Sequence, residues 1–164
     1  CAGLPATARP DQTASAGAQL LWQTARHATP DLPFLCGDVT PRALRVPEGS
    51  VREHPNGALG VASLTVAVHD LDASLDRYRA LLGPGLPLQR LDNQGARLAL
   101  PGFDLLLQGA QALAASDALR QRLATRGEGP CALTLRQRPG APAQPLDLAA
   151  SHGVDMRWHG VNTL

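Results

Sequence analysis

The clearest hydrophobic pattern in the chain lies between residues 61 and 83. Residues 61–68 are rich in valine and threonine, which predicts a β-strand. Apolar side chains then recur in steps of four and three residues, which predicts one buried stripe on a helix. The stripe consists of Leu71, Leu75, Tyr78 and Leu82. Asp70 is placed to cap the first turn of this helix and Gly83 to end it.

Shorter patterns of the same kind continue to the end of the chain. Strands are predicted at about 87–92, 96–100, 103–108, 131–137 and 154–158, with Pro101-Gly102 as a tight turn between the second and third. Residues 116–127 predict a helix with Ser116 as its cap and Leu119 and Leu123 on one face, and residues 146–153 predict a short helix. From residue 61 the order is therefore βαβββ, helix, βαβ, so that strand, helix and strand occur twice as a weak internal repeat.

The first third of the chain is less regular. Residues 1–17 are small and polar and are expected to be irregular. Two apolar runs, 18–25 and 33–36, predict two strands joined by a loop. Residues 37–60 contain several prolines and glycines, which interrupt both helices and sheets and indicate a linker.

Composition places the chain among globular proteins. Its 164 residues are enough for one domain or slightly more, 44% are hydrophobic and the formal net charge is +1. Such a balance argues against a disordered tail and against a nucleic-acid-binding protein. The basic residues are all arginine and alanine is abundant, which we interpret as the composition of a GC-rich bacterial genome.

The cysteines and the apolar runs limit the kinds of metal site, disulfide and cellular location that the sequence allows. Cys1, Cys36 and Cys131 are widely spaced, so neither a zinc knuckle nor a disulfide framework is indicated. No apolar run reaches the roughly 20 residues of a membrane span, and no signal peptide is visible, so a cytoplasmic location is expected. The sequence starts at Cys1, which indicates a truncated or proteolysed fragment, with a lipoprotein lipidated at this cysteine as the alternative.

Four stretches carry a resemblance to a known family. They are "SLTVAVHDLDASLDRYRALLG", "SDALRQRLATRGEGPCALTL", "LPFLCGDVTPRALRVP" and "HPNGALGV". The chain resembles the vicinal-oxygen-chelate superfamily, which includes glyoxalase I, extradiol dioxygenases, bleomycin-resistance proteins and methylmalonyl-CoA epimerases; the second stretch is particularly like the epimerases. The resemblance implies an α+β fold of glyoxalase-like βαβββ repeats, here one full unit plus partial units. Residues 18–50 would then hold the last strands of a truncated first repeat plus a linker. Residues 51–164 would hold the full unit, a linker helix and part of the next unit.

In this family the paired units form a cup, with helices on the convex side and a ligand on the concave side. Because side chains alternate along a strand, Leu64, Leu105 and Leu107 are expected to face the helices. Ala67 is expected to face the cup, as are the candidate ligand-binding residues. These are Ser63, Thr65, Arg97, Asp104, Leu106, Ala132, Thr134 and Arg136.

The metal-binding positions that the resemblance implies are poorly occupied. The first histidine position falls on Ser63, the carboxylate position on Asp104, and the second histidine position on Ala132. The fourth lies in a C-terminal hairpin that the chain is expected to lack. A divalent ion needs several ligands in fixed geometry, so we expect no metal and no other cofactor.

Three functions remain open at this point. The first is a metal-free protein that binds a small, carboxylate-bearing organic molecule in the cup, with arginine as the carboxylate-binding residue. The second is a lyase, isomerase or dioxygenase whose metal ligands lie in a missing N-terminal part or a partner chain. The third is an oligomerisation module. No catalytic residue is identified, and the expected partners are a small molecule and a second copy in a homodimer, with no nucleic acid and no membrane.

Overall fold

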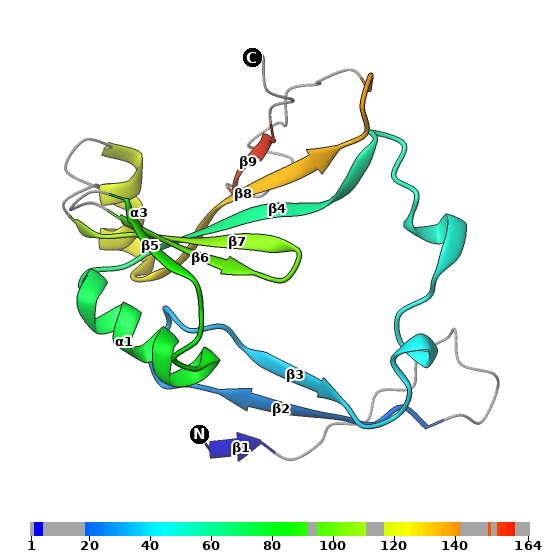
Figure 1. The fold of residues 1–164 in the computed structure, drawn as a ribbon, viewed down its shortest axis with the longest axis horizontal. Coiled ribbons are helices and arrows are strands. Elements are labelled where there is room, and N and C mark those ends of the chain that lie inside the picture. Colours follow the sequence, from blue (N-terminus) through cyan, green and yellow to red (C-terminus); the bar gives the residue numbers. More distant parts are fainter. Residues whose placement is uncertain are drawn as a thin grey trace. The chain divides into compact units, whose positions relative to one another are not determined.

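The computed structural model describes residues 2–4, 19–91, 95–110, 117–141, 151 and 154–159. The chain forms two compact units, Cys1–His54 and Pro55–Leu164. Each unit has its own β-sheet (Figure 1). No helix in the described ranges is long and apolar enough to cross a membrane.

The first unit is a small antiparallel sheet. Its strands are β1 (Ala2–Leu4), β2 (Trp22–Arg26) and β3 (Leu35–Asp38), in the order β1-β2-β3. The two predicted strands are present but begin later than expected. The expectation of an irregular segment 1–17 is wrong for residues 2–4, because their backbone pairs with β2, and this pairing depends on a tertiary partner.

The segment expected to be a linker contains local structure at both ends. Two 3-10 turns, η1 (Arg42–Leu44) and η2 (Gly49–Arg52), follow β3. The next strand, β4, begins at Ala58 and ends at Ala67, three residues before the predicted start and one before the predicted end. The prolines and glycines therefore separate the two sheets, as the pattern indicated, but over a shorter stretch.

The second unit contains a six-stranded sheet in the order β5-β6-β7-β4-β8-β9. Its elements are β4 (Ala58–Ala67), α1 (Leu71–Leu82), β5 (Leu88–Leu91), β6 (Gly95–Leu100), β7 (Phe103–Gln108), α3 (Asp117–Arg126), β8 (Gly129–Gln137) and β9 (Asp155–Trp158). The stretch from β4 to β7 is the predicted βαβββ unit, in which the last strand, β7, returns to pair in parallel with β4. Ser116 and nearly all of the short helix predicted at 146–153 lie outside the described residues.

Helix α1 lies along one face of this sheet (Figure 1). The Asp70 side chain accepts a hydrogen bond from the Ala73 amide at 3.0 Å, and Gly83 ends the helix with φ of 93°, so both predicted end signals are confirmed. Leu75 and Tyr78 are buried, but Leu82 is 41% exposed. Leu82 was wrongly placed in the stripe: it is the last residue of the helix and is exposed, whereas Leu81 is half-buried.

The core between α1 and the sheet follows the predicted alternation. Leu105 and Leu107 of β7 are buried, while Asp104 and Leu106 are only half-buried. The prediction fails at Ala67, which is fully buried and packs with Leu123 of α3 and Cys131 of β8. The register of β4 against β8 shifts between Thr65 and Val66, and such a bulge changes which side chains share a face.

The centre of the sheet has an approximate two-fold symmetry. Strands β4 and β8 are antiparallel, with Leu64 opposite Leu133. On the outer side of each lies one parallel strand, β7 beside β4 and β9 beside β8. The predicted internal repeat does not use one pairing twice, because β9 pairs directly with β8 whereas β5 lies three strands away from β4.

Candidate functional site

The two central strands place a carboxylate at equivalent positions of the two halves. Asp104 of β7 lies opposite Ser63 of β4, and Asp155 of β9 lies opposite Ala132 of β8. Asp155 thus has the same position relative to Ala132 that Asp104 has relative to Ser63. The sequence pattern alone does not reveal this, because it does not show that β9 pairs in parallel with β8.

Each of these carboxylates is bound by an arginine. The Arg97 Nε atom of β6 lies 2.8 Å from Asp104 Oδ2, on the diagonal across the β6–β7 pair. The hydrogen bond to the carboxylate raises the pKa of Arg97, so the guanidinium stays charged. Arg157 donates from Nε to Asp155 Oδ1 at 3.1 Å and from its terminal nitrogen to Oδ2, and this pairing raises the pKa of Arg157 in the same way.

These four positions do not fit the divalent metal that the resemblance implies. Ala132 has no donor atom, Ser63 offers only a hydroxyl group, and the two carboxylates are already paired with guanidinium groups. A protein site for zinc or a similar ion needs several nitrogen, sulfur or oxygen donors directed at one point. In the described part of the chain, no group of three or more His, Cys, Asp and Glu side chains could hold an ion.

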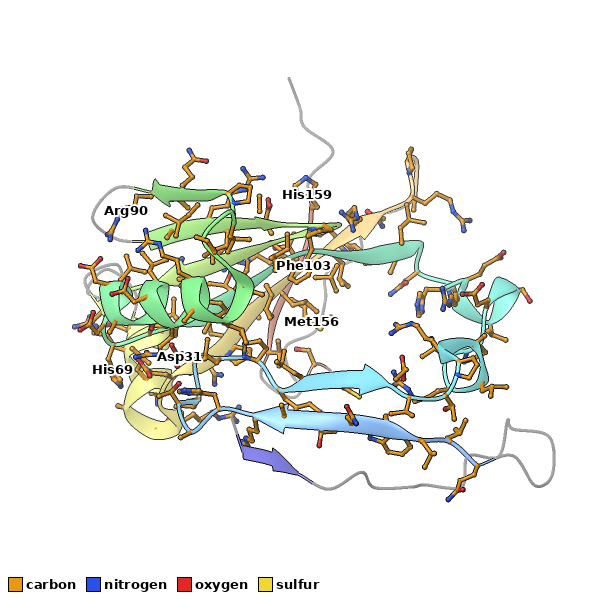
Figure 2. All side chains as sticks on the ribbon, turned by 60° about the horizontal axis from the view of Figure 1, so that its bottom comes forward. Asp31, His69, Arg90, Phe103, Met156 and His159 are labelled. Atoms are coloured by element: carbon orange, nitrogen blue, oxygen red, sulfur yellow. The ribbon has the colours of Figure 1, made fainter. Side chains whose placement is uncertain are left out.

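A pocket of about 280 Å³ opens where the β6–β7 hairpin approaches the end of β8. We call it the hairpin pocket. It is lined by Ala62, Leu100, Gly102, Phe103, Asp104, Arg136 and His159. Figure 2 shows the described side chains of the chain, with Phe103 and His159 labelled. Residues from β4, the hairpin, β8 and the end of β9 thus meet at one place.

Two hydrogen bonds to backbone carbonyl groups fix residues of the pocket. Arg136 donates from its terminal nitrogen to the Gly102 carbonyl at 2.5 Å, which ties β8 to the hairpin turn. Gly102 has φ of 93°, the left-handed conformation that the third residue of this turn requires. The His159 amide donates to the Leu135 carbonyl at 2.7 Å, which fixes the residue beside β8.

Three ionisable side chains therefore converge on the hairpin pocket: Asp104, Arg136 and His159. The Asp104 side chain is 32% exposed, so its carboxylate remains accessible beside Arg97. The remaining wall is formed by Leu100, Phe103 and the small Ala62. Chemically, the pocket offers hydrogen-bond donors, one carboxylate and an apolar surface.

The structure brings together some of the candidate residues and separates others. Asp104 and Arg136 line the hairpin pocket, and Arg97 contacts it through its ion pair with Asp104. The other candidates lie along the central strands outside the lining, and Thr65 is only 9% exposed. They are Ser63, Thr65, Leu106, Ala132 and Thr134.

Five of the seven residues that line the pocket were not predicted from the sequence, among them Phe103, Ala62 and His159. Phe103 alternates in phase with Leu105 and Leu107, which face the helices, but at the turn it lines the pocket. Ala62 lies in a register shift between Val61 and Ser63, which no periodic pattern reveals. His159 follows the last strand, and only the parallel pairing of β9 with β8 brings it to the hairpin.

The two described cysteines have different environments. Cys36 is exposed on β3. Cys131 is buried, and its thiol donates to the Thr65 carbonyl at 3.4 Å. Burial raises the pKa of the Cys131 thiol, which keeps it protonated and poorly nucleophilic.

Comparison with solved structures addresses the fold. A hypothetical protein from Staphylococcus aureus is similar over 96% of this chain and 56% of its own, with a TM-score of 0.61 and 6% identity. The chain is a mixed α+β protein and shares its fold with that protein. Methylmalonyl-CoA epimerase from Mycobacterium tuberculosis matches 64% of this chain and 89% of its own at 20% identity, with a TM-score of 0.47. A hypothetical protein from Bacillus halodurans matches 60% and 91% at 16% identity, with a TM-score of 0.45.

The similarity to the Staphylococcus aureus protein shows a shared fold and nothing beyond it. No protein-family model matches the sequence, and no curated protein matches it. At such low identities the matches carry no information about ligand or activity, because one fold hosts several chemistries. The function must therefore be argued from the side chains of the site.

Proposed function

We propose that the glyoxalase-like unit binds a small organic carboxylate in the hairpin pocket without a metal ion. The observation that carries this proposal is the convergence of Arg136 and His159 with an apolar wall around a space of about 280 Å³. Guanidinium groups bind carboxylates through paired, charge-assisted hydrogen bonds. Arg136 uses a terminal nitrogen for the Gly102 carbonyl, and its other N–H groups serve a ligand.

The size of the pocket limits the ligand. Pockets for drug-sized molecules span about 300–1,000 Å³, and the hairpin pocket lies at the small end of that range. Leu100 and Phe103 provide the apolar surface against which a short hydrocarbon group packs. The ligand is therefore a compact carboxylate with an apolar part.

The alternative function, a metal-dependent lyase, isomerase or dioxygenase, finds no support in the donor set of this sheet. Asp104 and Asp155 are both engaged by arginines, and Ala132 cannot ligate. That alternative requires ligands from outside this chain. Elemental analysis of the purified protein tests it, since one equivalent of bound metal would favour it over the metal-free proposal.

Isocaproate and isohexanol test the proposal directly, because they share one hydrocarbon skeleton and only the first carries a carboxylate. In metal-free buffer, isocaproate is expected to raise the melting temperature and the alcohol is not. Arg136→Gln should abolish this shift, whereas Arg138→Gln, an exposed arginine outside the pocket, should retain it. Equal stabilisation by the alcohol, or an unchanged shift in Arg136→Gln, would contradict carboxylate binding at this site.

Self-association into a homodimer stays a prediction from the sequence. Light scattering over a range of concentrations tests it. A strict monomer at the highest concentration would refute it without affecting the proposed binding site.

A further inference from the structure

The hairpin pocket contains charges of both signs. Arg136 and His159 provide donors on the side of β8 and β9, and Asp104 provides a carboxylate on the side of β7. Arg97 engages Asp104 through Oδ2 at 2.8 Å. Within the described residues Oδ1 has no such partner, so it is available to accept a hydrogen bond from a ligand.

A simple carboxylate would use only half of this arrangement. Its oxygens would be bound by Arg136, but it has no donor for Asp104 Oδ1, and its negative charge would lie near that carboxylate. A simple amine has the opposite fault, because its charge would lie near the Arg136 guanidinium. A ligand with an ammonium group close to its carboxylate satisfies both sides, and the space of about 280 Å³ keeps the two groups near one another.

We infer that the hairpin pocket selects α-amino acids with an apolar side chain over simple carboxylates and simple amines. The ammonium group donates to Asp104, the carboxylate accepts from Arg136 and His159, and the side chain packs against Phe103 and Leu100. The Phe103 ring adds a favourable surface for a cation. This inference rests on the proposed function and specifies its ligand class.

Three ligands with one skeleton separate the two claims. Leucine has both charged groups, isocaproate lacks the ammonium group, and leucinamide lacks the carboxylate. Calorimetric titration of the full chain at neutral pH is expected to show leucine binding about tenfold more tightly than either of the others, since each missing group removes one charge-assisted hydrogen bond. Equal or tighter binding of isocaproate overturns the inference and leaves the proposed function standing. No binding by leucine and isocaproate overturns both.

A pair of aspartate variants assigns the selectivity to a residue. Asp104→Asn should remove the preference for leucine over isocaproate. Asp155→Asn, the equivalent position in the other half of the sheet and outside the pocket, should retain it. Melting curves of both variants verify that they are folded. If Asp104→Asn does not fold, the ranking of the three ligands on the unmodified chain decides whether the pocket prefers amino acids. A preference that survives in folded Asp104→Asn, or is lost in Asp155→Asn, overturns the assignment.

Discussion

Replacing Leu75 by alanine tests whether the inner face of α1 holds the second unit together. Leu75 is 0% exposed and lies between the buried Ser74 and Tyr78. Removing a buried leucine side chain costs its transfer free energy plus a cavity term, together about 2–5 kcal/mol. Because nothing of Leu75 reaches solvent, we expect a loss near the middle of that range, about 3 kcal/mol.

Leu82→Ala on the same helix is the matched control. Leu82 is 41% exposed, so much of its side chain already contacts water. Fully burying a leucine is worth roughly 1.5–3 kcal/mol, and the partial burial here should cost about 1 kcal/mol on truncation. Alanine has the highest helix propensity, so neither variant weakens the helix itself.

Urea unfolding followed by circular dichroism measures both losses. The free energy of unfolding comes from linear extrapolation, and the dependence on urea should not change. A loss for Leu75→Ala no larger than that for Leu82→Ala would show that α1 does not bury the Leu75 face, and would refute the packing described for this unit. The stronger change Leu75→Asp should prevent folding, because it buries a charge without a partner.

Three further changes test local features of the second unit. Asp70→Ala should lower the free energy of unfolding by about 1 kcal/mol through loss of the helix cap, whereas Asp70→Asn should have little effect. Gly95→Ala should lower the free energy of unfolding in urea by more than about 1 kcal/mol, the typical cost of forcing extra atoms into a packed core. The reason is that the new Cβ would lie 2.8 Å from the Leu107 carbonyl oxygen. Gly85→Ala is the control and should be neutral, because the space around Gly85 is open. The raised pKa of Cys131 favours the protonated thiol in the folded state, so its contribution to stability is complete below the ordinary pKa of 9.0 and falls as the pH rises above it. Melting temperatures at pH 8 and 10 should therefore decline less in Cys131→Ala than in the unmodified chain; an equal decline would contradict this.

The sequence by itself determined the periodic elements of the second unit. The strand at 103–108 has the predicted bounds, and the helix from Leu71 to Leu82 begins and ends at its predicted signals. These features depend on contacts between near neighbours in the chain, such as a carboxylate three residues before the amide that it caps. The alternation that buries Leu105 and Leu107 is equally local.

The tertiary structure decided where the chemistry lies. Strand β9 pairs in parallel with β8, which brings Asp155 opposite Ala132 and His159 to the hairpin. Register shifts in β4 change the faces that strict alternation would have assigned: Ala62 lines the pocket, and Ala67 is buried instead of facing the cup. Periodicity specifies the face of an isolated strand, but partner choice and bulges depend on the whole sheet, because they arise from hydrogen bonds between segments far apart in the chain.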